Sequence, residues 1–441
     1  MTTGISQKGA FRRNVKWQLV GSASQAVLSG LLLLLMGREL GTSGFGVFSI
    51  VMGYVYVANL LFEPRMQDVA ARQFWNFNPK SIDRKQSQYF IDLFGMEALG
   101  KLLPCAGLIL LAPYLADFGK LAPDGAALIT VAAIGVYVSK VGNGLSVGLL
   151  RVLGRSDFNA YCATGELLLR VLLTLALIKF YTLSVLAGIL VLCFSGFLSN
   201  LLQWMLTMKQ LKNMHFALGE WRFSSARERF RENRRLLYAN LGLSASDLMN
   251  KDLDVALLSP LLPSDQIGIY KMAKNIALLT WRAVDPFCLA LMPEVNRLVS
   301  LGDLNGVKRL LAKSALGLLG LAAGLGLMSY FALSFFGDSL LGRDFSNISK
   351  LMPWMLIGIV SSAPLVWGHA LAVALNRAEF ALMGSLFGSA VGLFAFLTLP
   401  SLYGMYGAGM AWTLTFLLNF SFTAGVSHYV LRKRARFSIV R

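Results

Sequence analysis

Charged residues, cysteines and histidines are scarce in this sequence. Only 15% of its 441 residues are charged, whereas an average soluble chain carries about 25%, and 56% are hydrophobic. The three histidines are scattered, and no paired Cys/His spacing indicates a metal site. All four cysteines lie within apolar stretches: Cys105, Cys162, Cys193 and Cys288. The composition argues against a soluble globular protein, and we expect neither a metal nor another cofactor.

Long apolar runs fill most of the chain. A membrane-spanning helix needs about 20 apolar residues, and this criterion gives about twelve segments. They lie near residues 17–36, 44–63, 89–112, 126–150, 159–180, 182–208, 236–258, 266–292, 312–336, 350–373, 380–400 and 405–430. The longest stretch outside them, 209–235, is too short for a separate soluble domain. The sequence therefore predicts an all-α polytopic membrane protein with its chemistry inside the helix bundle.

The net charge of +18 is distributed according to membrane topology. Lys and Arg concentrate at both termini and in alternate loops, at 65–88, 151–158, 209–235, 293–311 and 374–379. The opposite loops hold only Arg38, Lys120, Lys179, Arg343 and Lys350. By the positive-inside rule, both termini and the basic loops are expected in the cytoplasm. Because this pattern accounts for the positive charge, we do not expect the chain to bind nucleic acid.

Two of the predicted spans carry polar side chains along one helical face. One set of polar residues recurs at alternating steps of four and three positions: Asn240, Ser244, Asp247, Lys251 and Asp254. A second set falls within roughly a 100° arc: Lys271, Lys274, Asn275, Arg282 and Asp285. A charge at the bilayer centre costs about 2.5–3.5 kcal/mol or more, so these faces are expected to meet each other or a water-filled cavity. A polar cavity across a membrane indicates a transporter.

An internal repeat relates the two halves of the chain. A shift of 222 residues places 45–48 (FGVF) on 267–270 (IGIY), and Glu63-Pro64 on Asp285-Pro286. The repeat predicts two pseudo-symmetric six-helix lobes, residues 1–208 and 236–441, joined by the basic linker 209–235. Because each half has an even number of helices, the lobes would share one orientation.

Several motifs resemble a known family. They are Gly37-Arg38-Glu39-Leu40-Gly41 with 45–49 (FGVFS), and Asp254 followed by 267–271 (IGIYK) and Pro293-Glu294. The pattern resembles the polysaccharide transporters, which include the O-antigen and exopolysaccharide repeat-unit flippases of the multidrug/oligosaccharidyl-lipid/polysaccharide exporter superfamily. This resemblance implies transport of undecaprenyl-diphosphate-linked oligosaccharide across the bacterial cytoplasmic (inner) membrane by alternating access between the lobes. The expected partners are that substrate, membrane lipids and other membrane proteins of lipopolysaccharide or exopolysaccharide assembly.

The resemblance also suggests site residues. The candidate contacts to phosphate or acidic sugar are the basic residues within spans: Lys140, Arg170, Lys251, Lys271, Lys274 and Arg282. If transport is ion-coupled, Asp247 and Asp254 are the candidate proton or sodium sites. Two interpretations stay open for Arg170, since the i, i+4 partner Glu166 could simply neutralise it, as Glu97 could neutralise Lys101.

Three rival functions remain at this stage. A multidrug and toxin extruder would share the twelve-helix plan, but cation export favours an acidic lumen, and the first segment, 17–36, has no carboxylate. A lipid II flippase would usually carry two further helices. A membrane-embedded glycan polymerase or ligase would place catalytic residues in a sizeable outer loop, and the outer loops here are short. The sequence therefore favours a transport protein over an enzyme.

Overall fold

The computed structural model describes residues 7–62, 65–75, 84–212, 223–246, 251–377 and 379–438, and all regular structure within them is helical. The first half contains α1 (Gln7–Leu61), α2 (Met66–Trp75), α3 (Arg84–Phe118), α4 (Gly125–Lys140), α5 (Asn143–Val152), α6 (Ser156–Phe180), α7 (Val185–Lys212) and α8 (Phe223–Ser246). The second half contains α9 (Leu253–Leu258), α10 (Ser264–Arg282), α11 (Asp285–Ser300), α12 (Leu304–Leu341), α13 (Ile348–Ser362), α14 (Trp367–Ala374) and α15 (Glu379–Ser438). Short 3₁₀ turns occupy Arg343–Phe345 and Ala363–Leu365. The all-α prediction is confirmed.

Eight helical stretches of the described chain are long and apolar enough to cross a membrane. Two of them, Ser24–Arg72 through α1 and α2 and Glu379–Lys433 within α15, each cover all or most of two predicted segments. Gly41 in α1 (φ 64°) and Gly404 in α15 (φ 58°) leave the helical conformation, which glycine does without the steric cost of a Cβ atom. Each long helix thus consists of two helices joined at a glycine. The chain is a multi-pass membrane protein, although its eight candidate spans are fewer than the twelve predicted segments.

The predicted spans 236–258 and 266–292 are not continuous helices in the structure. The helix α8 ends at Ser246, Lys251 and Asp252 lie in a turn, and α9 begins at Leu253, so Asn240 and Asp254 do not share one helix. Beyond α9, Pro260 and Pro263 lack the backbone N–H that a continuing helix would need. Asp247 lies outside the described residues.

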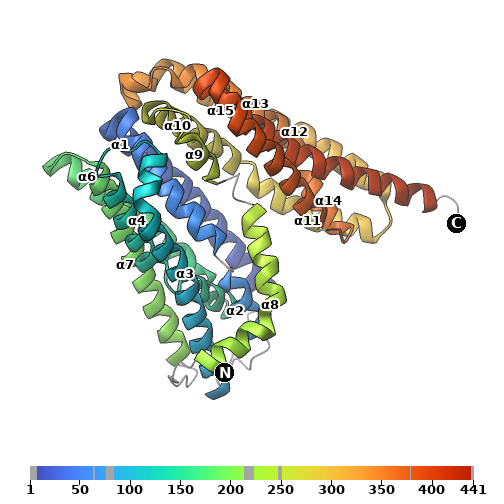
Figure 1. Ribbon diagram of the computed structural model, residues 1–441. Coiled ribbons are helices and arrows are strands. Elements are labelled where there is room, and N and C mark those ends of the chain that lie inside the picture. The colour runs from blue at the N-terminus through green and yellow to red at the C-terminus, as the bar shows by residue number, and fades with distance from the viewer. Residues whose placement is uncertain are drawn as a thin grey trace. The chain divides into compact units, whose positions relative to one another are not determined.

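Contacts divide the chain into two compact units. We define unit 1 as Met1–Leu35 with Val51–Ala245, and unit 2 as Met36–Ile50 with Ser246–Arg441. In unit 1, α4 packs against α3 and α7, and α7 packs against α6 (Figure 1). In unit 2, α13 packs against α10, α12 and α15. These units follow contacts, whereas the predicted lobes follow the sequence repeat, so the lobe and linker boundaries stay predictions.

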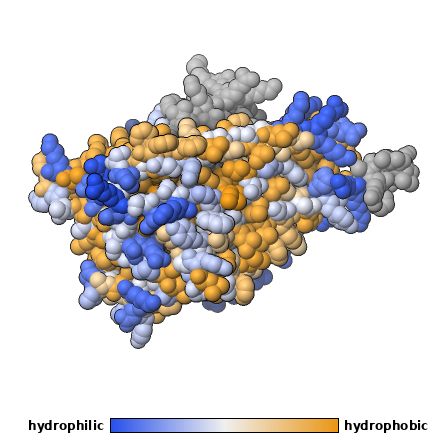
Figure 2. Space-filling view, turned by 90° about the horizontal axis from the view of Figure 1, so that it is seen from above, coloured by the Kyte–Doolittle hydropathy of each residue, from blue (hydrophilic) through white to orange (hydrophobic). Residues whose placement is uncertain are grey.

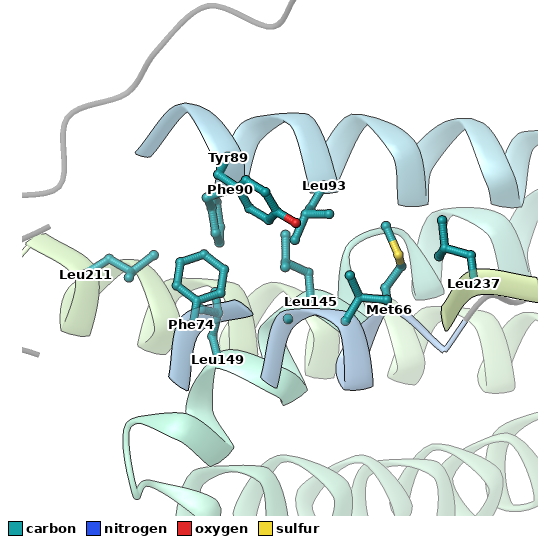
Figure 3. Packing of buried hydrophobic residues seen from close by; sticks show 11 residues of the cluster. Met66, Phe74, Tyr89, Phe90, Leu93, Leu145, Leu149, Leu211 and Leu237 are labelled. Atoms are coloured by element: carbon teal, nitrogen blue, oxygen red, sulfur yellow. The ribbon is translucent and has the colours of Figure 1, made fainter. Parts of the chain in front are cut away.

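A hydrophobic cluster holds the helices of unit 1 together. Figure 3 shows side chains from α2, α3, α5, α7 and α8 meeting: Met66, Phe74, Tyr89, Phe90, Leu93, Leu145, Leu149, Leu211 and Leu237. Beside the cluster, Trp204 of α7 makes edge-to-face contacts with Phe90 and Phe94, at centroid distances of 5.8 and 5.1 Å. This packing fixes α3 against α5, which positions the polar residues of the next turn of α3.

The surface carries many large apolar side chains. Phe335 on α12 is 77% exposed and Leu110 on α3 is 75% exposed. Hydrophobic residues also cover much of the face in Figure 2. Water would penalise this exposure, whereas a lipid environment does not, so the surface agrees with the membrane assignment.

Candidate functional site

A buried ion pair forms the centre of a polar cluster in unit 2. The Lys274 ammonium of α10 lies 2.6 Å from Asp254 Oδ2 of α9, and both side chains are fully buried. Tyr270, one helical turn before Lys274, also donates its hydroxyl proton to Asp254. The ammonium donates further to the carbonyl oxygen of Lys251. The break between α9 and α10 thus brings a carboxylate onto the face of α10 that carries Tyr270 and Lys274.

A second ion pair lies beside the buried one. Lys271 pairs with Asp252, and these side chains keep exposed fractions of 15% and 19%. Lys251, in the turn before α9, is exposed. Three lysines therefore accompany two aspartates in this cluster, which leaves one positive charge in excess on its accessible side. Such an arrangement can attract an anion more strongly than the same charge in water would.

Two further candidate residues, Arg282 and Asp247, belong to the same two predicted polar faces. Arg282 is the last residue of α10, about 12 Å along the helix axis from Lys274, and it is exposed. Asp247 lies outside the described residues. Of the predicted site residues, the structure therefore brings together Lys251, Lys271, Lys274 and Asp254, and it places Arg282 at the far end of the same helix.

A second buried pair closes the break between α4 and α5 in unit 1. Glu97 accepts hydrogen bonds from the backbone N–H groups of Gly144 and Leu145, both at 2.9 Å. Lys101 donates to Glu97 at 2.7 Å and to the carbonyl oxygen of Lys140 at 2.6 Å. A carboxylate thus caps the start of α5 while an ammonium caps the end of α4, which complements both helix dipoles. Lys140 contributes its backbone here, and its side chain is half-buried.

Arg170 lies in another part of unit 1. Its guanidinium pairs with Glu166 and donates to Ser195 Oγ at 2.9 Å. The i, i+4 pair that the sequence allowed is therefore formed, as is the one between Glu97 and Lys101. In this structure the positive charge of Arg170 is compensated by its helical neighbour.

Sequence reasoning missed an amide network next to the α4–α5 break. Asn143 donates to Gln203 at 2.8 Å, and Gln203 donates to Asn159 at 2.7 Å. Asn200 donates to the carbonyl oxygen of Val141 at 2.8 Å, at the break itself. The signal that could have revealed the network was the presence of Asn and Gln side chains within the apolar segments, since polar groups inside a membrane need hydrogen-bond partners there. Among the described residues, no group of three His, Cys, Asp or Glu side chains could hold a metal ion.

The family of the chain follows from its sequence. A family profile described as Polysaccharide biosynthesis protein matches residues 11–299, which include the cluster of unit 2. The chain belongs to this family. The resemblance drawn from the motifs is therefore confirmed. No curated protein matches this chain.

Solved structures show the same fold in transport proteins. The lipid II flippase MurJ in an inward closed conformation matches with a TM-score of 0.68 and 12% identity, over 93% of this chain and 86% of that one. An inward-facing multidrug resistance MATE transporter of the MOP superfamily matches with a TM-score of 0.67 and 11% identity, over 93% and 96%. The Vibrio cholerae MATE transporter VcmN in its bent form gives 0.56 and 13%, over 96% and 98%. The chain thus shares its fold with membrane transport proteins.

Proposed function

We propose that this protein is a flippase that moves undecaprenyl-diphosphate-linked oligosaccharide, the repeat unit of a surface polysaccharide, across the bacterial cytoplasmic membrane. The observation that carries the proposal is the excess positive charge of the unit 2 cluster, in a chain of the polysaccharide biosynthesis family. A lipid diphosphate needs fixed cations in a poorly hydrated site, while its glycan needs hydrogen-bonding groups. The family membership supports a glycan precursor, and the lysines support its diphosphate.

The basic residues fall into two groups within this proposal. Lys251 and Arg282 are exposed, and Lys271, although paired with Asp252, belongs to the cluster with the excess positive charge, so we assign all three the contacts with phosphate or acidic sugar. Lys140 has a half-buried side chain and is a further candidate contact. Lys274 and Arg170 are paired with carboxylates, and we propose that they hold these carboxylates in place until a change of conformation breaks the pairs.

Asp254 is our candidate for ion coupling. Its Oδ2 atom binds Lys274 and Tyr270, but its buried Oδ1 atom has no hydrogen-bond partner among the described residues. A buried acceptor without a partner is costly, and a proton or a cation would satisfy it. Asp247 remains a second candidate from the sequence alone. We propose that alternating access between the two predicted lobes, with both termini in the cytoplasm, carries the glycan outward as O-antigen or exopolysaccharide.

Multidrug extrusion is the second candidate function. The fold similarity to MATE transporters favours it, and so do the carboxylates of Asp252 and Asp254. In this alternative, the aspartates would bind a cationic drug, and the lysines would be their structural partners. The two functions differ in the sign of the charge that is bound.

Binding to the purified protein separates them. A polyprenyl-diphosphate oligosaccharide should bind in competition with a short-chain diphosphate analogue, and Lys251→Gln or Lys271→Gln should weaken this binding by about tenfold. Lys308→Gln, which removes an exposed charge on α12, is the matched control and should leave it unchanged. Cationic dyes should bind poorly. Tight dye binding without diphosphate binding would favour multidrug extrusion over the flippase.

Export in cells gives an independent test. Arg282→Ala should reduce surface polysaccharide with little loss of the protein from the membrane, because its side chain is exposed. Lys271→Ala should do the same, because its partner Asp252 keeps 19% exposure and can be hydrated once the lysine is gone. Cells that lack the gene should accumulate the lipid-linked precursor on the inner leaflet and keep their resistance to cationic drugs. Normal polysaccharide in both single variants would contradict the assigned contacts.

A further inference from the structure

The helix α8 is held in a fixed rotation against α3 by polar contacts. Ser225 Oγ donates to Asp92 Oδ1 at 2.8 Å, and Asn233 donates to the hydroxyl of Tyr89 at 2.7 Å. Between them, the Arg229 guanidinium lies 4.8 Å from the centre of the Tyr89 ring and 3.9 Å from the buried carboxylate of Asp92. One face of α8 is thereby occupied by unit 1.

Arginines occupy the opposite face of α8. With about 100° per residue, four arginines and Tyr238 fall within an arc of about 100°, centred roughly 170° from the docked face. The four are Arg227, Arg231, Arg234 and Arg235, and all of them are exposed. Because the docked face fixes the rotation of the helix, this row of guanidinium groups points away from unit 1.

The acidic residues of α8 do not compensate the row. Glu228 and Glu232 fall outside the arc, and Glu232 pairs with Arg229 at 2.9 Å. Within the described part of the chain, none of the four arginines forms an ion pair. The face therefore carries four positive charges over about 12 Å of helix, none of them in an ion pair among the described residues.

Two aromatic side chains lie at the same surface. Phe230 is 41% exposed and Tyr238 is 60% exposed. Their rings meet edge to face with centroids 6.1 Å apart. Exposed aromatic rings beside arginines are typical of segments at the headgroup level of a bilayer, where one end of each ring is wet and the other apolar.

We propose that the outer face of α8, formed by Arg227, Arg231, Arg234, Arg235, Phe230 and Tyr238, binds the headgroups of anionic phospholipids. Charge complementarity favours an anion. The length of the row favours several headgroups over one diphosphate, whose two phosphates would meet only neighbouring arginines. The surface is distinct from the cluster of Lys251 and Lys271, and this inference does not depend on which substrate is transported.

The test compares lipids and variants on the full-length purified protein. Phosphatidylglycerol should raise the melting temperature and bind in native mass spectrometry, whereas phosphatidylcholine should do neither. Arg231→Gln with Arg234→Gln should weaken phosphatidylglycerol binding by about 25-fold, since each basic residue near an anionic surface contributes about fivefold. The matched control removes two exposed charges of α12, Lys308→Gln with Arg309→Gln, and should keep the binding.

Two further measurements keep the proposal falsifiable if the glutamine variant misfolds. Arg231→Lys with Arg234→Lys should retain most of the binding, and 0.5 M salt should abolish it in the unmodified protein, because surface electrostatics is screened. Equal loss of binding in the α12 control would overturn the assignment to α8. A polyprenyl diphosphate that displaces the phospholipid from the α8 face would show that this face receives transport substrate instead. Equal binding of both phospholipids would overturn the proposal entirely.

Discussion

Gly46 and Gly268, which are 222 residues apart in the chain, pack against each other reciprocally within unit 2. A Cβ atom on Gly46 would lie 1.7 Å from the carbonyl oxygen of Ser264, and one on Gly268 would lie 2.0 Å from that of Thr42. Thr42 and Ser264 are separated by the same 222 residues. The two equivalent segments thus contact each other about a local two-fold axis, which supports the internal repeat found in the sequence.

Alanine at either glycine should destabilise the protein. Because backbone atoms occupy the space of the new methyl group, Gly46→Ala and Gly268→Ala must push the two segments apart, at a cost of about 1–3 kcal/mol. The melting temperature of the purified protein should therefore fall in both variants, and by similar amounts because the contact is reciprocal. Gly317→Ala is the matched control, since no atom lies within 4 Å of a Cβ there. It should stabilise α12 by roughly 0.5–1 kcal/mol. Unchanged melting of the Gly46 and Gly268 variants would contradict the close packing.

Local patterns in the sequence predicted much of the fold and some of the site. Apolar windows predicted the helical segments, and i, i+4 spacing allowed the pairs of Glu97 with Lys101 and of Glu166 with Arg170, because residues four apart share a helical face. The repeat aligned Gly46 with Gly268, but an alignment does not reveal that equivalent residues touch.

Such patterns could not predict contacts between residues on either side of a helix break. The pair of Asp254 and Lys274 depends on the turn between α9 and α10, and a single continuous helix would have placed Asp254 elsewhere. The capping of α5 by Glu97 requires the break at Gly142, which adopts a φ of 72°. Periodicity reports which residues share a face of one element, and it does not report where two elements meet.

The ion pair of Asp254 and Lys274 should be structural in the conformation described. Lys274→Met leaves a buried carboxylate without its cation, which typically costs about 3–5 kcal/mol, so the variant should melt earlier and accumulate less in the membrane. Asp254→Asn combined with Lys274→Met removes both charges and should recover most of this loss. A double variant as unstable as Lys274→Met alone would show that the two charges are not coupled.

Cysteine labelling tests the membrane topology. In a background with the four native cysteines replaced, Arg231→Cys should resist a membrane-impermeant thiol reagent added to intact cells, because the positive-inside rule places 209–235 in the cytoplasm. Asp344→Cys should react, since Asp344 is exposed and lies in a loop predicted on the opposite side. Permeabilised cells provide the control, in which both positions should react. Labelling of Arg231→Cys alone in intact cells would invert the predicted orientation.

Glu97 should matter more for stability than Glu166, although both pair with a basic residue four positions later. The carboxylate of Glu97 accepts from two backbone N–H groups of α5 as well as from Lys101, whereas Glu166 pairs with Arg170. Glu97→Gln replaces one acceptor oxygen by a donor, so a buried N–H loses its partner and Lys101 loses its counter-charge. We expect a loss of about 2–4 kcal/mol, seen as a lower melting temperature. Glu166→Gln is the matched comparison and should cost less, because its pair keeps some exposure and Ser195 still accepts from Arg170. Equal losses would mean that capping the α4–α5 break contributes nothing beyond the ion pair.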